Sequence, residues 1–269
     1  MKKISVLMSL YYKEKPEYLF SCLESIFNQT LLCDEIVLVL DGGITKSLQN
    51  ILDLWLEKLP LKIVPLPENI GLGKALNEGM KYCSHEWIFR MDTDDICFPN
   101  RFEKQITYIE QNPDIDIFSG QVVEFSKNYL EYNSKKQVPL SHPEILKFAK
   151  HRCPFNHMAI AYKKSVVETV GGYQHHSMME DYNLWIRVLA AGYKSANLPE
   201  NLVYVRAGNA MLERRRGCNY VESEWKLFKL KQNLNFQSLG SAFFIFILRS
   251  IPRILPVSVL NLVYKYLRN

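Results

Sequence analysis

Short apolar runs alternate with amphipathic segments through the first hundred residues. Four runs have the length and composition of buried strands: Ile4–Leu10, Glu35–Leu40, Lys62–Leu66 and Trp87–Met91. The segments that follow them carry apolar residues at helical spacing, and these helices are expected to begin near Pro16, Leu48, Leu72 and Pro99. The alternation predicts an α/β fold, with a Rossmann-like and mostly parallel central sheet flanked by helices.

The second half has a less regular pattern. It predicts strands at Phe118–Phe125 and His157–Tyr162, and helices at Met179–Ala191 and Cys218–Leu234. The last segment, 241–269, is apolar but interrupted by basic residues, and Pro252 and Pro256 are expected to divide it into two short helices. Such a basic amphipathic stretch suits a membrane interface, although a helix packed on the domain would have a similar pattern.

Composition and charge narrow the class of protein. The chain has 269 residues, of which 48% are hydrophobic and 23% charged, as in ordinary folded soluble proteins. The net charge of +5 comes from basic residues after Arg206, and this mild excess does not require a nucleic-acid partner. Six cysteines without a C-x-x-C pair favour a reducing compartment without disulfides. No apolar run reaches about 18 residues, so no transmembrane helix is expected, and Ile4–Leu10 is expected to be a strand rather than a signal peptide.

Acidic residues follow two of the predicted strands. Asp41 comes after the second strand and Asp92 after the fourth, and ligands in such sheets bind at the carboxyl ends of strands. Asp92, Asp94 and Asp95 place three carboxylates within four positions, where they repel one another. A divalent cation such as Mn²⁺ or Mg²⁺ would neutralise them, whereas the alternative is a solvated acidic turn.

Three further patterns are compatible with phosphate or proton chemistry. Gly71 and Gly73 let the backbone approach a ligand, and Lys74 could meet a phosphate, although the spacing fits neither a P-loop nor a dinucleotide fingerprint. Glu180 and Asp181 open a helix, which is also what helix capping would favour. The arginines match phosphate oxygens, but a solvated basic loop would have the same composition: Arg206 and Arg214–Arg216.

Taken in order, these motifs resemble those of family 2 glycosyltransferases with the GT-A fold, in the branch that builds bacterial surface polysaccharides. The resemblance covers Ile4 to about Gly217. Its matching pieces are Ser5–Ser9 with Tyr11, Asp41-Gly42, Asn69–Leu72, Asp92–Asp95, Gly171–Tyr173 and Glu180–Trp185. It implies a GT-A domain over 1–217, with a nucleotide-binding half at 1–98 and an acceptor half at 99–217. Residues 218–269 would be a C-terminal helical extension that could associate with a membrane.

The resemblance also implies an activity: inverting transfer of a hexosyl or N-acetylhexosaminyl group from a nucleotide-sugar, expected to be a UDP-sugar, to a hydroxyl of a saccharide acceptor. The acceptor is expected to be lipid-linked, as in O-antigen or capsule synthesis, at the cytoplasmic face of the inner membrane. No nucleic acid is expected as a partner. The cofactor would be Mn²⁺ or Mg²⁺.

Site residues follow from the same resemblance. The base and ribose would be held by Ser9, Tyr11 and Asp41. The nucleotide pocket would also be lined by Asn69, Gly71 and Lys74. The metal would be held by Asp94, with Asp92 at the metal or the ribose. The diphosphate would lie near Arg206 and Arg214. The general base would be Asp181. The acceptor would lie near His157, Glu180 and Trp185, with a buried structural role equally open for the histidine.

Three rival functions use parts of the same pattern. A glycosidase could pair Asp92 or Asp94 with Asp181 across a glycosidic bond. A phosphatase with the D-x-D-x-T motif is disfavoured, because Ile96 stands where Thr or Val is needed and the motif follows the fourth strand. A non-catalytic module that binds sugar nucleotides would not need Glu180 and Asp181.

Overall fold

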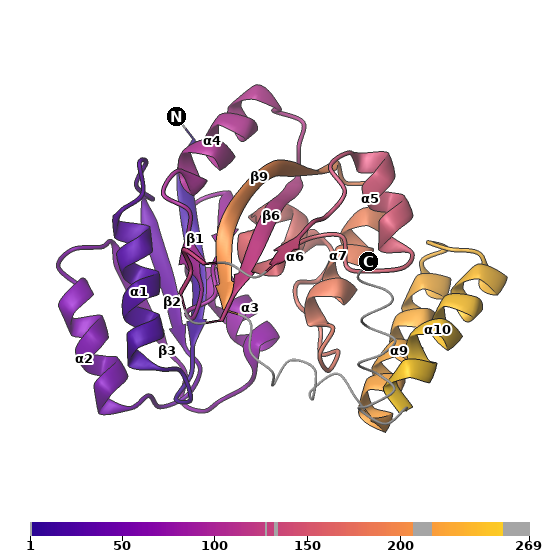
Figure 1. Ribbon diagram of the computed structural model, residues 1–269, viewed down its shortest axis with the longest axis horizontal. Helices are drawn as coiled ribbons and strands as arrows, with labels where there is room; N and C mark the ends of the chain where they lie inside the picture. Colours follow the sequence, from indigo (N-terminus) through magenta and orange to yellow (C-terminus); the bar gives the residue numbers. More distant parts are fainter. Residues whose placement is uncertain (1, 127, 132–133, 207–216, 255–269) are drawn as a thin grey trace.

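A computed structural model describes residues 2–126, 128–131, 134–206 and 217–254 (Figure 1). Its strands are β1 Ile4–Leu10, β2 Glu35–Leu40, β3 Leu61–Pro65, β4 Trp87–Arg90, β5 Ile96–Cys97, β6 Ile117–Phe125, β7 Ser134–Lys136, β8 Ala161–Lys163 and β9 Ser195–Arg206. Its helices are α1 Pro16–Phe27, α2 Lys46–Trp55, α3 Leu72–Tyr82, α4 Arg101–Gln111, α5 His142–Ala149, α6 Lys164–Thr169, α7 Glu180–Ala190, α9 Cys218–Asn233 and α10 Leu239–Ile254.

The strands form one mixed sheet in the order β3-β2-β1-β4-β8-β6-β9-β5, with β7 paired to β6. Strands β3, β2, β1 and β4 are parallel, and so are β6 and β9. Strand β8 lies antiparallel between β4 and β6. Two reversals restore the direction, so the carboxyl ends of β1, β2, β4, β6 and β9 meet at one edge of the sheet.

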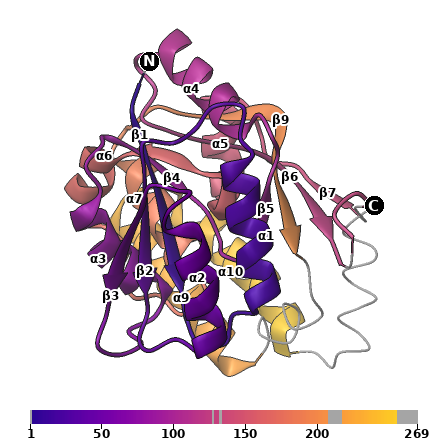
Figure 2. The same ribbon diagram turned by 90° about the vertical axis from the view of Figure 1, so that its left-hand side faces the viewer.

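Helices cover both faces of the sheet, and the alternation along β1 shows why. Ile4, Val6 and Met8 pack in one core cluster with the apolar residues of α1 and α2. Leu7 points to the opposite face, into a second cluster with α3 and α7. Figure 2 shows α1 and α2 in front of the sheet, with α3 behind it. Burial on both faces explains why these strands are continuously apolar.

The predicted elements of the first half are confirmed. β1 and β2 have the predicted bounds, and the other two strands are displaced by a residue or less at each end. The prediction for His157–Tyr162 was partly wrong, because residues 157–159 form a 3₁₀ turn and β8 begins at Ala161. No internal pattern predicted β9, since its middle carries Pro199 and polar residues and its pairing with β6 shifts register at Gln121.

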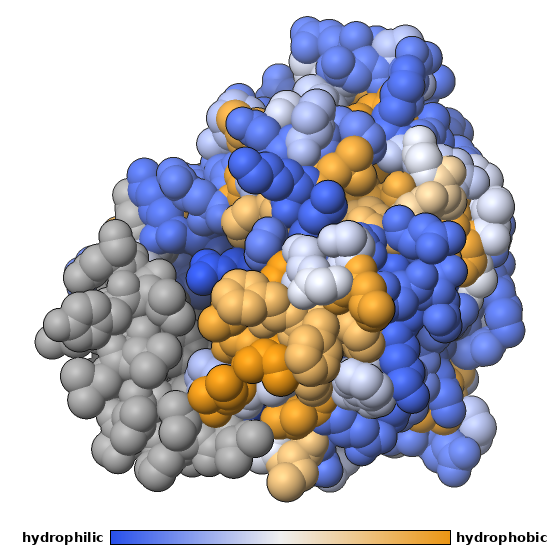
Figure 3. Space-filling model, turned by 90° about the vertical axis from the view of Figure 1, so that its right-hand side faces the viewer, coloured by the Kyte–Doolittle hydropathy of each residue, from blue (hydrophilic) through white to orange (hydrophobic). Residues whose placement is uncertain are grey.

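The C-terminal helices α9 and α10 pack against each other beside α7 (Figure 1). The prediction that Pro252 divides this segment is wrong, because α10 continues through it to Ile254. The proline lies in the last turn, where its missing N–H removes one helical bond and leaves the earlier turns intact. Pro256 lies outside the described residues. Apolar side chains gather on the outer surface of these two helices (Figure 3). Among the helices that the structure describes, none combines the length and apolar character needed to cross a bilayer.

Candidate active site

Three carboxylates meet in the turn that follows β4. Oxygens of Asp92, Asp94 and Asp95 all lie within 4.8 Å of one another. The turn is fixed at its start by the Met91 N–H, which donates to the Leu7 carbonyl at 3.1 Å. Carboxylate oxygens at this spacing are able to hold a hard divalent cation.

Burial and mutual repulsion make this cluster unfavourable without a counter-charge. Burial raises the pKa of Asp94 to about 7, and the charges of Asp92 and Glu14 add to that rise. Burial also raises the pKa of Asp95 well above its ordinary value, with Asp92 and Asp94 contributing. A bound cation would favour the charged forms and reverse both shifts. The electrostatics therefore fit a metal site.

Arg90 lies beneath this cluster and was not assigned a role from the sequence. It is 1% exposed, and its guanidinium forms an ion pair with the Asp92 carboxylate. If Asp92 moved away, the buried Arg90 charge would be left uncompensated. The ion pair therefore restrains the Asp92 carboxylate. The sequence did carry a signal, because an arginine interrupts an otherwise apolar strand at Arg90.

Arg206, at the end of β9, closes the acidic turn from the other side. Its backbone N–H donates to Asp95 Oδ1 at 2.8 Å, and its Nε donates to the Asp94 carbonyl at 3.2 Å. Its guanidinium lies 3.7 Å from the ring centroid of Tyr18 and 4.6 Å from that of Phe125. The two rings hold the cation in place beside the carboxylates. Arg214, the second predicted diphosphate contact, lies outside the described residues.

Asp41 ties the end of β2 to the loop before α3. Its carboxylate accepts hydrogen bonds from the N–H groups of Ile70 at 2.7 Å and Gly71 at 3.1 Å, and its carbonyl accepts one from Asn69 Nδ2. Gly42 is needed for this approach, because its φ is +84° and a Cβ there would lie 2.8 Å from the Asn69 nitrogen. The buried carboxylate thus shapes the loop, and its contact with a base stays a prediction.

The other predicted nucleotide residues lie at the same edge. Ser9 is half-buried near the end of β1, and Lys74 is exposed in the first turn of α3. Tyr11 is 41% exposed and meets Tyr12 edge to face. Their side chains are therefore accessible, while their roles remain predictions.

A second loop joins this half of the site to α7. Asn77 on α3 clamps Tyr173 by donating from Nδ2 to its carbonyl at 2.7 Å and accepting from its N–H at 2.8 Å. A Cβ on Gly172 would lie 2.6 Å from Asn77 Oδ1, so only glycine fits. A Cβ on Gly73 would lie 3.4 Å from Glu180 Cγ. Close packing of α3 thus sets where α7 begins.

Tyr173 lies between the acidic turn and the start of α7. Burial raises the pKa of its hydroxyl; Arg90 opposes this rise, whereas the charges of Asp181 and Asp92 add to it. The hydroxyl is hydrogen-bonded to His157 Nε2 at 2.9 Å. Both Asp92 and Asp181 are therefore close enough to influence one buried aromatic group.

Asp181 is the second residue of α7, while Met179 occupies the N-cap. Its Oδ1 accepts from the Tyr182 N–H at 2.7 Å, and its Oδ2 is contacted by the Cys153 thiol at 3.7 Å. Burial raises the pKa of the neighbouring Glu180, and the Asp181 charge contributes. The carboxylate is half-buried, so it combines restraint with access.

Of the three residues predicted to lie near the acceptor, Trp185 is the one whose burial contradicts the prediction. It is 0% exposed, and its ring packs among those of Phe155, His157 and Tyr173. A side chain without exposed surface supports the site from beneath and does not touch an acceptor. His157 is half-buried, and burial lowers its pKa well below the ordinary value. Its role, and that of Glu180, remain predictions.

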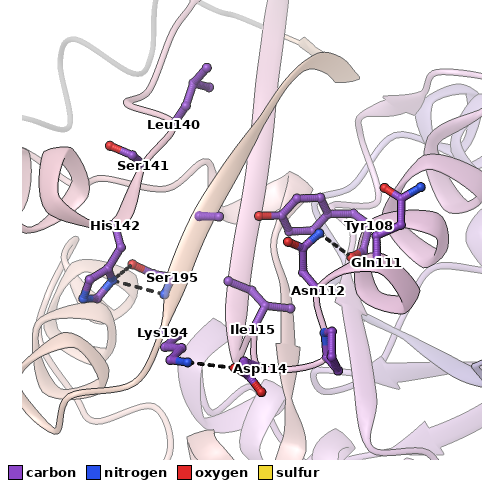
Figure 4. A pocket seen from close by; sticks show the side chains of 12 residues that line it. Tyr108, Gln111, Asn112, Asp114, Ile115, Leu140, Ser141, His142, Lys194 and Ser195 are labelled. Atoms are coloured by element: carbon purple, nitrogen blue, oxygen red, sulfur yellow. Dashed lines mark hydrogen bonds and ion pairs between the residues drawn. The ribbon is translucent and has the colours of Figure 1, made fainter.

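A groove of about 610 Å³ lies elsewhere, at the amino ends of β6 and β9 and the end of α4 (Figure 4). His142 Nδ1 is hydrogen-bonded to Ser195 Oγ at 2.7 Å in its wall, and Lys194 pairs with Asp114 at 3.0 Å. The acidic turn and Arg206 lie at the carboxyl ends of β4 and β9, whereas this groove lies at the amino ends of β6 and β9. The groove is therefore at the opposite edge of the sheet from the candidate site.

Residues 5–171 match the sequence model described as Glycosyl transferase family 2. The chain belongs to this family of glycosyltransferases. This match, over more than half of the chain, includes the acidic turn and the loops around Asp41 and Gly71. The enzyme class expected from the motifs is thereby confirmed.

Relatives cover nearly the whole chain. An uncharacterized glycosyltransferase of Haemophilus influenzae is 54% identical, over 98% of both chains. The amylovoran biosynthesis glycosyltransferase AmsE of Erwinia amylovora is 48% identical over 97% of both. A UDP-Gal:alpha-D-GlcNAc-diphosphoundecaprenol beta-1,3-galactosyltransferase of Escherichia coli is 38% identical, over 98% of this chain and 95% of the relative.

Solved structures share the fold at low identity. S. aureus TarS aligns with a TM-score of 0.70 and 17% identity, over 92% of this chain and 43% of TarS. Residues 1–349 of TarS in complex with UDP-GlcNAc give 0.68 and 18%, over 91% and 70%. The mannosyltransferase PcManGT of Pyrobaculum calidifontis, in complex with GDP-Man and Mn²⁺, gives 0.66 and 17%, over 98% and 80%. These likenesses confirm the predicted GT-A type of fold.

Proposed function

We propose that this glycosyltransferase moves a sugar from a UDP-sugar to a hydroxyl of a lipid-linked saccharide, with inversion at the anomeric carbon. One observation carries the proposal: three carboxylates meet in the acidic turn beside the Arg206 cation, and the charges of Asp92 and Asp181 both act on the buried Tyr173 hydroxyl. The Escherichia coli relative, named for a UDP-Gal donor and a diphosphoundecaprenol acceptor, supports this choice of substrates. The related fold of TarS in complex with UDP-GlcNAc supports a uridine nucleotide.

Asp181 would act as the general base. The acceptor oxygen attacks the anomeric carbon from the face opposite the diphosphate, and its proton passes to the Asp181 carboxylate. A bond forms from that oxygen to the carbon, and the bond from the carbon to the diphosphate oxygen breaks. The nucleoside diphosphate leaves with the bonding electrons, so no covalent intermediate with the protein is needed.

Asp94 and Asp92 would hold Mn²⁺ or Mg²⁺, which when bound would stabilise the charge that gathers on the diphosphate. The buried, mutually repelling carboxylates fit that role. Arg206 adds a fixed positive charge next to the turn. Asp95 accepts a hydrogen bond from the Arg206 N–H, so its main role would be to shape the turn and not to bind the metal.

The nucleotide would lie across the carboxyl ends of β1 and β2. Tyr11 and Lys74 are exposed there and can meet the base or a phosphate, and Ser9 lies beside them. Asp41 would reach a base through lone pairs that its two loop hydrogen bonds leave free. Asn69 and Gly71 would line the same pocket.

Calorimetric titration with UDP, with GDP as control and with or without Mn²⁺, tests the donor. We expect UDP to bind at least tenfold more tightly than GDP, and to need the metal. Equal affinity for UDP and GDP would contradict the donor assignment. UDP affinity that is the same with and without Mn²⁺ would contradict the metal assignment. An assay for hydrolysis of glycosides without nucleotide tests the glycosidase alternative, and we expect no activity.

We further propose that the outer face of α9 and α10 rests on the anionic cytoplasmic surface of the inner membrane. Its exposed apolar residues are Trp225, Phe243, Phe244, Leu248 and Ile251. Figure 3 shows this surface, and Lys229 lies over the Trp225 ring at 5.3 Å. Aromatic and aliphatic groups bordered by a cation match the interface of an anionic bilayer, where a lipid-linked acceptor would be found.

Sedimentation with vesicles that contain anionic lipid tests the membrane proposal. The double change Phe244→Glu and Leu248→Glu should abolish most of the binding, because it places two charges in the apolar face. Leu54→Glu is the matched control, since Leu54 is 55% exposed, close to the 54% of Leu248, but lies on α2. Wild-type protein that stays in the supernatant would contradict the proposal.

A further inference from the structure

A buried polar cluster joins α9 and α10 to the start of α7. Lys231 of α9 is 3% exposed, and its Nζ donates to the Lys150 carbonyl at 2.8 Å and to the Tyr182 hydroxyl at 3.0 Å. The Tyr182 hydroxyl donates in turn to the Ala149 carbonyl at 2.7 Å. One lysine therefore holds both the end of α5 and the residue that follows Asp181.

An ion pair between a buried glutamate and a partly exposed arginine extends the cluster. Glu224 is 3% exposed and accepts from Arg249 Nε at 2.7 Å, across the α9–α10 interface. Arg249 Nη1 reaches the His151 carbonyl at 2.5 Å. Three consecutive carbonyls, those of residues 149–151, thus accept hydrogen bonds from this cluster.

A second connection reaches α7 from the preceding loop. His176 Nε2 donates to the Ser223 carbonyl of α9 at 2.8 Å. Its Nδ1 accepts a hydrogen bond from Asn183 Nδ2 at 3.1 Å, and Asn183 Oδ1 accepts one from Arg187 Nε at 2.9 Å. The first turns of α7 are therefore held by α9 on two sides.

Among the described residues, two groups contact the Asp181 carboxylate, and both lie in or next to these held segments. Oδ1 accepts from the Tyr182 N–H, and Oδ2 is contacted by the thiol of Cys153, two residues beyond the carbonyl that Arg249 binds. Burying a lysine is costly, and Lys231 is 3% exposed, so its amine needs the hydrogen-bond partners that this cluster supplies.

We propose that Lys231 is a positioning residue, which fixes the first turn of α7 so that Asp181 meets the acceptor hydroxyl. The inference rests on the proposed role of Asp181 as the base. It makes α9 and α10 part of the catalytic apparatus, in addition to their proposed membrane face. Consistent with this enclosed setting, burial lowers the pKa of Lys231 to about 7; Arg249 contributes, and Glu224 and Cys153 oppose it.

Steady-state kinetics of Lys231→Met test the proposal. This change removes the donors and keeps much of the side-chain volume. We expect kcat to fall by about 10- to 100-fold, because a small misplacement of a reacting group lowers the rate by about that factor. The KM for the donor and the Kd of UDP should stay unchanged within about twofold. Lys226→Met is the matched control, because Lys226 is an exposed lysine on the same helix. Tyr182→Phe, which removes only the hydroxyl, should lower kcat in the same direction.

A double-mutant cycle separates positioning from general damage. If Lys231 acts through Asp181, then Lys231→Met should lower the residual kcat of Asp181→Asn by less than twofold. An undiminished loss in that background would overturn the positioning role, as would wild-type kcat in Lys231→Met. Wild-type activity of Asp181→Asn alone would instead refute the base, and with it the proposed function of this carboxylate. An inactive Asp181→Asn beside an active Lys231→Met would refute only the positioning.

Discussion

The proposed nucleotide side and the proposed acceptor side of the candidate site are built in different ways. On the nucleotide side, Asp41 directly follows β2 and Asp92 lies two residues beyond β4, both strands of the parallel part of the sheet. The Asp41 carboxylate accepts hydrogen bonds from loop residues only 29 and 30 positions away. On the acceptor side, Asp181 opens a helix held by contacts from Lys231 and Arg249, which lie 81 and 98 residues from the carbonyls they bind. The first side depends on strand ends, and the second on buried polar contacts between distant segments.

The largest expected effect tests the acceptor side. Asp181→Asn should lower kcat by about 10²- to 10⁴-fold, because the amide cannot take the proton, while UDP binding stays intact. Turnover with the donor and a lipid-linked acceptor, measured beside calorimetry with UDP, checks both statements. A parallel loss of UDP binding would mean that the two sides are not independent.

The next effect tests the nucleotide side. Asp94→Asn should weaken Mn²⁺-dependent UDP binding by at least the 10- to 100-fold that is typical of lost contacts around a metal. Titration with UDP at fixed Mn²⁺ gives the number, and Glu103→Gln, a change of an acid on α4 away from the turn, is the control. Unchanged affinity would remove Asp94 from the metal site.

A glycine pair tests how the Asp41 loop is held. Gly42→Ala should destabilise the protein by about 1–3 kcal/mol and weaken UDP binding, because its positive φ and the 2.8 Å approach to Asn69 both exclude a Cβ. Gly43→Ala meets nothing within 4 Å and should change stability by less than about 1 kcal/mol. Urea denaturation of both variants measures the difference, and equal stabilities would contradict this view of the loop.

The smallest effect concerns pH and the buried lysine. The pKa of Lys231 is about 7 in the folded protein and about 10.4 in the unfolded chain, so the unfolded chain binds more protons between these values. Stability contributed by this group therefore rises with pH above about 7 and is flat below it. Relative to Lys231→Met, the wild-type free energy of unfolding should increase by about 1 kcal/mol per pH unit from pH 7 to 9. If urea denaturation instead gives the same difference in unfolding free energy between the two proteins at every pH, then the pKa of Lys231 is not lowered.

Much of the nucleotide side could be predicted from the sequence. The bounds of β1 and β2 and the placement of Asp92 at a strand end follow from apolar runs that the sheet buries on both faces. The acceptor side was less readable, since α5, α6 and β7 have short or mixed patterns. Trp185 was predicted to lie near the acceptor, but its apolar neighbours within α7 were equally compatible with the core position it occupies.

Sequence patterns alone were enough to predict the α/β class, the edge of the sheet that carries the acidic turn and the glycosyltransferase family. They could do so because hydrophobic periodicity and motif order are local properties of the chain. Two features could be seen only once the chain was folded: Arg206 closes the turn at Asp94 and Asp95, and Lys231 and Arg249 reach the neighbourhood of Asp181. These contacts depend on the register in which distant segments pack, since a polar side chain is buried only where that packing supplies its partner.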